Sequence, residues 1–259
     1  MNGTSGAKLD APSAMPRRRW RWIGVLAMVS VVSVLVASYH NVPVSVSAED
    51  REYIARIFSE GGHDGLLERG SEPGSFDHEV HFILAVQDAV LRFAPHAEPI
   101  PNDQPREPKD LYQARRGQCF DRSRTIEKAL ALAGFRVRHV AVYATDGSAN
   151  RLAAMLIPST RSHSLTEVET SRGWMAIDSN GRWIGLTSEY QPVSVASLQR
   201  NARLRDGAWA EIVPERIDRI FTSDFVHVIG LFSRHGGFYA PYTPVPDVNW
   251  GQLLDNLPG

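Results

Sequence analysis

The single cysteine of this chain, Cys119, is the residue best suited to nucleophilic chemistry. It stands in GQCFDRSRTIEKALALAGF, where Ile126, Leu130 and Ala133 recur at helical spacing before a glycine, so we expect a helix that begins at the thiol. Unpaired N–H groups and the helix dipole make a first turn positive, which favours the nucleophilic thiolate. The alternative is a buried structural thiol, because lone cysteines often pack as small apolar side chains.

A thiol nucleophile needs a base, and the stretch SHSLTEVETSRGWMAIDSN offers one. Two runs of strand character flank a short turn near residues 171–173. In an antiparallel hairpin, His163 lies directly or diagonally opposite Asp178, close enough for the side chains to touch. If this hairpin packs on the Cys119 helix, a Cys119–His163–Asp178 triad follows. Otherwise His163 and Asp178 are polar residues at strand ends.

Gln118, directly before the thiol, has two interpretations. Its side chain can line an oxyanion site together with the N–H of Cys119. It can also cap the helix, as polar residues commonly do at this position.

The stretch DHEVH places His78 and His81 three residues apart on a predicted helix, near Asp77. Zinc sites need at least three protein ligands, and the sequence offers no clear third one here. We therefore predict no metal, and the thiol chemistry requires no organic cofactor.

The elements that must position these residues are helices followed by strands. Helices are expected in AEDREYIARIFSEGG and FDHEVHFILAVQDAVLRFAP, the second with an apolar stripe that Gln87 interrupts. Strand character marks FRVRHVAVYA, SLTEVET and GWMAID, with RWIGL (182–186) as a further candidate and VSVASLQRNARL as a later helix. Helices followed by antiparallel strands predict an α+β fold in which the Cys119 helix packs on an antiparallel sheet.

The N-terminal region predicts a membrane anchor. Arg17, Arg18, Arg19 and Arg21 precede a run from Ile23 to Ser38 without a charged residue. Aromatic residues flank this run, so we expect a single transmembrane helix over residues 22–39, with the N-terminus cytoplasmic and the main domain periplasmic or extracellular. The rival is a signal peptide cleaved after Ala48. Both interpretations place the main domain outside the cytoplasm.

Six segments follow from these patterns. They are a cytoplasmic tail (1–21), a transmembrane anchor (22–39), a linker (40–48), a helical N-terminal part (49–104), a core (105–190) and a C-terminal extension (191–259) containing the aromatic stretch SRHGGFYAPY. The net charge is −1, which gives no bulk basic field for nucleic acid. One cysteine excludes an intrachain disulfide and a multi-cysteine zinc site.

Three motifs give the sequence a specific resemblance. GQC, HSLTEV and GWMAID occur in the order in which the transglutaminase-like superfamily shows G-x-C, H-x-W/T-x-E-V and G-W-x-x-x-D. The resemblance covers residues 105–190, and Leu165 stands where an aromatic residue is common. It implies a papain-like α+β fold, with Cys119 as nucleophile, His163 as general base and acid, and Asp178 orienting His163.

The resemblance also implies a function. We expect an extracytoplasmic thiol enzyme that acts on an amide bond, by hydrolysis or acyl transfer, on a protein or peptide substrate. Partners in envelope polysaccharide machinery fit the same location, and no nucleic acid is expected. The family also includes inactive members, so the alternative is a non-catalytic binding or assembly module of the cell envelope.

Overall fold

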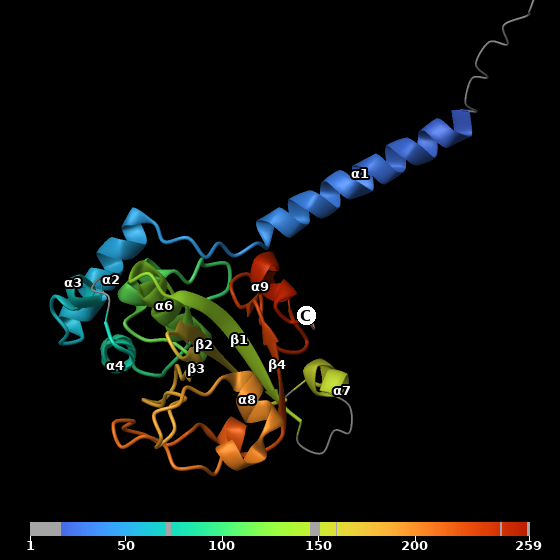
Figure 1. Cartoon of the computed structure of the whole chain (residues 1–259). Helices are drawn as coiled ribbons and strands as arrows, with labels where there is room; N and C mark the ends of the chain where they lie inside the picture. The colour runs from blue at the N-terminus through green and yellow to red at the C-terminus, as the bar shows by residue number, and fades with distance from the viewer. Residues whose placement is uncertain (1–16, 71–73, 146–150, 159, 244, 258–259) are drawn as a thin grey trace, which may run out of the picture. The chain divides into compact units, whose positions relative to one another are not determined.

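The structure is a computed structural model that describes residues 17–70, 74–145, 151–158, 160–243 and 245–257. It divides into two compact units, residues 1–40 and 41–259 (Figure 1). The elements, in chain order, are α1 (Arg17–Tyr39), α2 (Ala48–Glu60), α3 (Leu66–Gly70), α4 (Phe76–Phe93), α5 (Pro108–Ala114), α6 (Cys119–Leu132), β1 (Arg136–Ala144), α7 (Arg151–Leu156), β2 (Ser162–Thr170), β3 (Gly173–Ile177), α8 (Val195–Arg200), η1 (Ala202–Leu204), η2 (Arg219–Thr222), β4 (Phe225–Ile229), β5 (Leu231–Phe232), β6 (Asp247–Val248) and α9 (Trp250–Leu254).

The first unit contains α1, which covers the predicted anchor. Within the part of the chain that is described, no helix combines the length and the apolar content that a bilayer crossing requires. The transmembrane span predicted at residues 22–39 is therefore not confirmed. Of the predicted cytoplasmic tail, residues 1–16 lie outside the described residues.

The predicted helices of the second unit form where side chains cap their first turns. At α2, Ser47 Oγ accepts the N–H of Asp50 at 3.0 Å, while the Asp50 carboxylate accepts the N–H of Ser47 at 2.7 Å. At α4, Ser75 Oγ accepts the N–H of His78 at 3.4 Å. Each of these bonds satisfies a backbone donor that a helix start leaves unpaired. Both predicted helices are confirmed.

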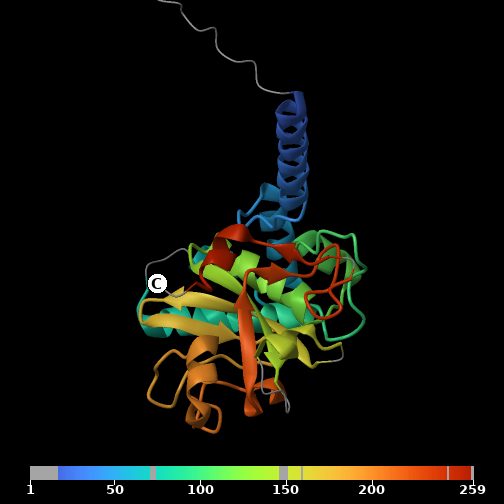
Figure 2. The same cartoon turned by 90° about the vertical axis from the view of Figure 1, so that its right-hand side faces the viewer.

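The central sheet has four antiparallel strands in the order β3-β2-β1-β4 (Figure 2). Val142 of β1 pairs with His163 of β2, and the β2–β3 hairpin closes at Thr170 and Gly173. The last pair of that hairpin joins Thr166 and Ile177. The four residues before Thr166, including His163, therefore have no partner on β3. This open edge of β2 is where the site forms.

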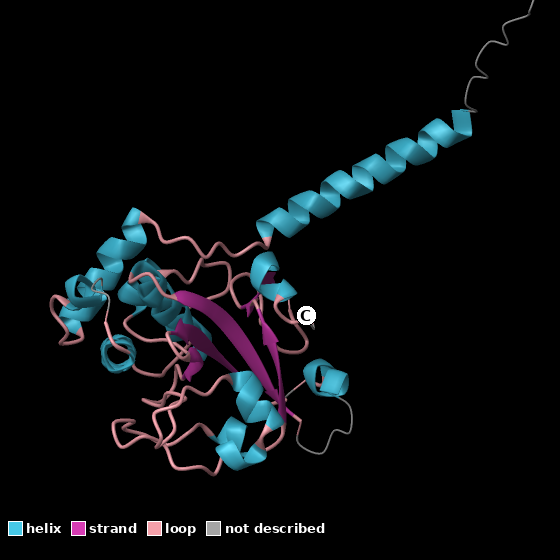
Figure 3. Ribbon diagram, in the orientation of Figure 1, coloured by secondary structure: helices cyan, strands magenta, loops and turns pink. Residues whose placement is uncertain are grey.

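Helices cover both faces of the sheet (Figure 3). On one face, an apolar core joins α2, α4 and α6 to Val168, Met175 and Ile177 of the strands. On the other face, α8 and η2 pack with Val140 and Leu165. Strand alternation sends neighbouring residues to opposite faces, which explains why Val168 and Leu165 separate. The mixed helical and antiparallel architecture confirms the predicted α+β class.

Two regions differ from the sequence prediction or extend it. RWIGL forms no strand: Ile184 makes an isolated bridge to Ile177, and Leu186 makes one to Pro192. Gly185 lies close to a neighbouring segment, because a Cβ there would be 2.2 Å from Val193 O. The C-terminal extension supplies β4 to the central sheet, so residues 41–259 form one compact unit.

Candidate active site

Cys119 is the first residue of α6, as the sequence predicts. Gly117 lets the chain enter the helix, because a Cβ there would lie 2.8 Å from Cβ of Asp121 and 3.1 Å from Leu111 Cδ1. Contacts under about 3 Å force a neighbour to move, so only glycine fits without displacement. The glycine two residues before the thiol is thus required by packing at the start of α6.

Asp121 locks that start in place. Its buried carboxylate accepts the N–H of Gln118 at 2.9 Å, the N–H of Ile100 at 3.2 Å and Arg106 Nη1 at 2.9 Å. Burial raises the pKa of Asp121, although Arg106 and the two N–H donors act to lower it. The first turn of α6 is therefore fixed to the loop before α5 through one carboxylate.

The open edge of β2 brings His163 and Asp178 together. His163 Nε2 lies 2.7 Å from Asp178 Oδ1, and the two residues are 3% and 1% exposed. Continuing the hairpin register places Asp178 opposite Leu165, so the His–Asp contact is the diagonal one. Nε2 faces Asp178, whereas Nδ1 is on the other side of the ring.

Cys119 lies beside this pair and affects its charge. Burial acts to lower the pKa of His163, but the charge and hydrogen bond of Asp178, with smaller contributions from Cys119, raise it well above its usual value. Burial acts to raise the pKa of Asp178, and His163 with the N–H groups of Asn180 and Gly181 lowers it overall. The arrangement favours an imidazolium beside the sulfur and a carboxylate behind it.

The loop that carries Asp178 is held from behind by Gln87. This side chain of α4 is fully buried, and its amide nitrogen donates to the carbonyl oxygens of Asp178 at 2.8 Å, Gly181 at 3.1 Å and Trp183 at 2.8 Å. Gln87 is the polar residue that interrupts the apolar stripe of α4. The sequence therefore showed an unusual polar residue, but its role could not be predicted, because its partner loop lies 91 residues later in the chain.

Arg122 and Asn180 are further residues of the site that the motifs did not indicate. Arg122 Nη2 donates to Asn180 Oδ1, and Asn180 Nδ2 lies 3.4 Å from His163 Nδ1. The N–H of Asn180 also donates to Asp178 Oδ1 at 3.0 Å. Gln118 is the N-cap residue of α6 and is half-buried, and its oxyanion role stays a prediction.

The thiol belongs to a buried apolar cluster. Cys119 is 8% exposed and clusters with Phe120, Tyr143 and Phe238. The aromatic C-terminal stretch is tied to the sheet, because Tyr143 Oη donates to the carbonyl of Phe238 at 2.5 Å.

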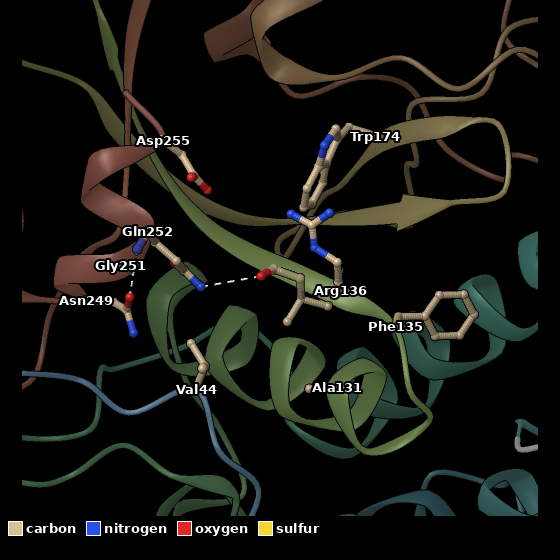
Figure 4. A pocket seen from close by; sticks show the side chains of 10 residues that line it. Val44, Ala131, Phe135, Arg136, Trp174, Asn249, Gly251, Gln252 and Asp255 are labelled. Carbon is tan, nitrogen blue, oxygen red and sulfur yellow. Dashed lines mark hydrogen bonds between the residues drawn. The ribbon is translucent and has the colours of Figure 1, made fainter. Parts of the chain in front are cut away.

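A pocket of about 450 Å³ lies elsewhere on the second unit (Figure 4). Its lining residues are Val44, Ala131, Phe135, Arg136, Val137, Trp174, Asn249, Gly251, Gln252 and Asp255. Ala131 follows Cys119 by twelve residues on α6, which corresponds to about 18 Å of helix. The pocket is therefore separate from the thiol. In its wall, the side chains of Asn249 and Gln252 already donate to protein carbonyl groups.

No interaction among the described residues joins His78 or His81 to the thiol site. Both are exposed on α4, and His81 Nδ1 donates to the carbonyl of Asp77 at 2.8 Å. Their positions give the triad neither a base nor a metal ligand.

Comparison with known proteins shows a family resemblance in the region of this site. The sequence model of the transglutaminase-like superfamily matches residues 75–179, a stretch that begins just before α4 and ends just after Asp178. Residues 75–179 are therefore similar to the transglutaminase-like superfamily. The matched stretch contains Cys119 and His163 as well, so all three predicted triad residues lie within the transglutaminase-like region.

Other comparisons add little to the family assignment. A solved structure from Cytophaga hutchinsonii, a proposed cysteine protease, is 16% identical over 54% of this chain and 45% of that one, with a TM-score of 0.33. The chain thus spans less than half of that protein, and so low a TM-score carries no inference about chemistry. No curated protein matches the sequence significantly.

Proposed function

We propose that the second unit is a thiol enzyme that transfers the acyl group of an amide, with Cys119, His163 and Asp178 as its triad. The observation that carries the proposal is the buried 2.7 Å contact between His163 Nε2 and Asp178 Oδ1, beside a cysteine at the first turn of a helix. A base oriented by a third group next to a nucleophile is the arrangement that covalent catalysis requires.

The reaction follows from this arrangement. The Cys119 thiolate attacks the carbonyl carbon, and a C–S bond forms while the carbonyl oxygen becomes an oxyanion. The N–H of Cys119 and the Gln118 side chain are the candidate donors to that oxygen. The C–N bond then breaks as His163 Nδ1 gives its proton to the leaving amine.

The second half-reaction regenerates the enzyme. Water, or a second amine in the case of transfer, gives a proton to His163 and attacks the thioester carbon. The C–S bond breaks and Cys119 leaves as a thiolate beside a protonated His163. Asp178 keeps its hydrogen bond to Nε2 throughout, which fixes the ring and supports its positive charge.

Alkylation by iodoacetamide at about pH 6 tests this proposal, because a thiolate reacts there and a structural thiol does not. We expect rapid labelling of the native protein and at least about tenfold slower labelling of His163→Ala, since loss of the imidazolium destabilises the thiolate. His78→Ala, at an exposed position, is the matched control and should label at the native rate. Native protein that labels only after denaturation would contradict the proposal.

The proposal also includes a class of substrate and a location in the cell. A protein or peptide substrate fits a transglutaminase-like domain, and envelope polysaccharide machinery is a further partner class. The basic residues before the uncharged run at Ile23–Ser38 favour a domain outside the cytoplasm, either anchored or released after Ala48. A reporter active only outside the cytoplasm, fused after Gly259, should work. Activity of a cytoplasmic reporter alone would contradict this location.

A non-catalytic module is the second candidate, because Cys119 is only 8% exposed and packs with Phe238. In that case Cys119→Ala would leave the cellular role intact, and its main effect would be a lower melting temperature from lost packing. A thiol enzyme would instead lose its role while its fold persists.

A further inference from the structure

Arg122 is a buried arginine without a carboxylate partner. Its side chain is 1% exposed, its Nη2 donates to Asn180 Oδ1, and its Nε lies 3.4 Å from the carbonyl oxygen of Gln118. Among the described residues, no Asp or Glu forms an ion pair with it. The other buried arginines each have such a pair: Arg106 with Asp121, Arg124 with Glu107 and Arg205 with Asp224.

A buried guanidinium needs a counter-charge, because an isolated ion is strongly disfavoured away from water. Burial lowers the pKa of Arg122, while the charges of Cys119 and Asp178, followed by Asp121, act to raise it. Asp178 is engaged by His163 and two backbone N–H groups, and Asp121 is paired with Arg106. Cys119 lies three residues before Arg122 on α6, so the two side chains are neighbours on one face of the helix.

Arg122 also acts on the base through Asn180. Because Asn180 Oδ1 accepts from the guanidinium, the amide nitrogen is turned towards His163 Nδ1 at 3.4 Å. The N–H of the same residue donates to Asp178. One arginine thus fixes the loop that contacts both members of the His–Asp pair.

We propose that Arg122 is a positioning residue of the thiol site: its buried charge stabilises the thiolate of Cys119, and its bond to Asn180 holds the loop that carries Asp178. This inference rests on the proposed function, since it assumes that the thiolate is the working form.

The charged and titratable groups around Cys119 come from five elements or loops. They are Arg122 on α6, His163 on β2, Asp178 after β3, Tyr143 on β1 and Tyr242 in the C-terminal stretch. Burial raises the pKa of both tyrosines, so they stay neutral between about pH 5 and pH 9. Changes of reactivity in that range therefore report the Cys119–His163 pair and the charge of Arg122.

The test is the iodoacetamide rate of the full chain between about pH 4 and pH 10, for the native protein, Arg122→Gln and Arg122→Lys. In Arg122→Gln we expect the pH of half-maximal rate to rise by about one unit, with an approximately tenfold slower reaction near pH 6. Arg122→Lys keeps the charge and should stay within about half a unit of the native protein. Arg116→Gln removes an exposed charge three residues before Cys119 and should change nothing.

Two results would overturn the inference in distinguishable ways. If the native protein labels near pH 6 and Arg122→Gln has the same profile, Arg122 has no positioning role and the proposed function stands. If the native thiol is inert near pH 6, the proposed function fails first, and the role of Arg122 fails with it. If Arg122→Gln does not fold, the double variant Arg122→Met with Asn180→Leu removes the guanidinium charge and its acceptor together. Its alkylation rate is then compared with the native pH profile in the same way.

Discussion

His163 and Asp178 make the stability of the protein depend on pH in a defined direction. The pKa of His163 is raised on folding, so its contribution is complete below its ordinary value near 6.5 and is lost as pH rises through the folded-state pKa. The pKa of Asp178 is lowered, so its contribution is present above about 3.9 and is lost as pH falls through the folded-state pKa. The pair therefore stabilises the fold most at mildly acidic pH.

We expect the difference in melting temperature between the native protein and His163→Gln to be largest near pH 6 and to shrink towards about pH 9. Thermal melts monitored by circular dichroism across this range give the measurement. His78→Gln, at an exposed position, should show no such trend. A difference that grows with rising pH would show that His163 is buried in its neutral form.

Among the individual residues of the site, the sequence predicts those whose relative positions follow from local structure. Cys119 could be placed at a helix start, and the hairpin alone brings His163 near Asp178. Arg122 and Asn180 could not be found in this way, because their contact joins α6 to the loop after β3 across 58 residues. Such a pair depends on how the helix rests on the sheet, and no periodicity encodes that.

The start of α6 requires a residue without a side chain at position 117. Gly117→Ala would place a Cβ 2.8 Å from Asp121, whose carboxylate holds three donors and cannot move freely. We expect a loss of about 1–3 kcal/mol in the free energy of unfolding, as overpacking usually costs, together with slower alkylation of Cys119.

Gly134→Ala at the other end of the same helix is the matched control. Its φ of 93° makes alanine strained, but no atom lies within 4 Å of the new Cβ. Urea unfolding should show a comparable stability loss, with the alkylation rate of Cys119 unchanged. Equal alkylation rates in both variants would mean that the thiol tolerates a displaced helix start.

Helix α4 supports the site through one side chain. Gln87→Glu would place a carboxylate against three carbonyl oxygens in a fully buried position, and we expect a loss of about 3 kcal/mol or more at pH 8. The deficit should decrease at about pH 5, because a protonated Glu can again donate. Gln87→Met removes the side-chain donor at all pH values, although Trp183 O keeps the N–H of Asp178, so its loss of about 1–3 kcal/mol should not depend on pH. Urea unfolding at both pH values distinguishes the two variants.

The elements themselves were predictable where caps and periodicity agree, as at α2, α4 and α6. RWIGL was not, since its apolar residues pack against the sheet through single bridges instead of a ladder. Apolar content reports burial, whereas strand formation also needs an aligned partner.

The whole second unit depends on its C-terminal part. Residues 191–259 supply β4, which pairs with β1 from Val140 to Ala144, and α8, which covers one face of the sheet. We expect residues 41–259 to unfold cooperatively in urea and residues 41–190 to remain unfolded, because the shorter fragment exposes an apolar face and a strand edge. A cooperative transition in the shorter fragment would mean that the core folds alone.

The thiol shares a buried apolar cluster with Phe238, and this has a consequence for biosynthesis. Phe238 is translated 119 residues after Cys119, which at roughly 5–20 residues per second is an interval of about 6–24 s. During that interval the nascent chain lacks the C-terminal residues of the cluster, so Cys119 is accessible to sulfenic acid formation or mixed disulfides. The oxidant exposure of a newly made molecule is thereby set by ribosome speed.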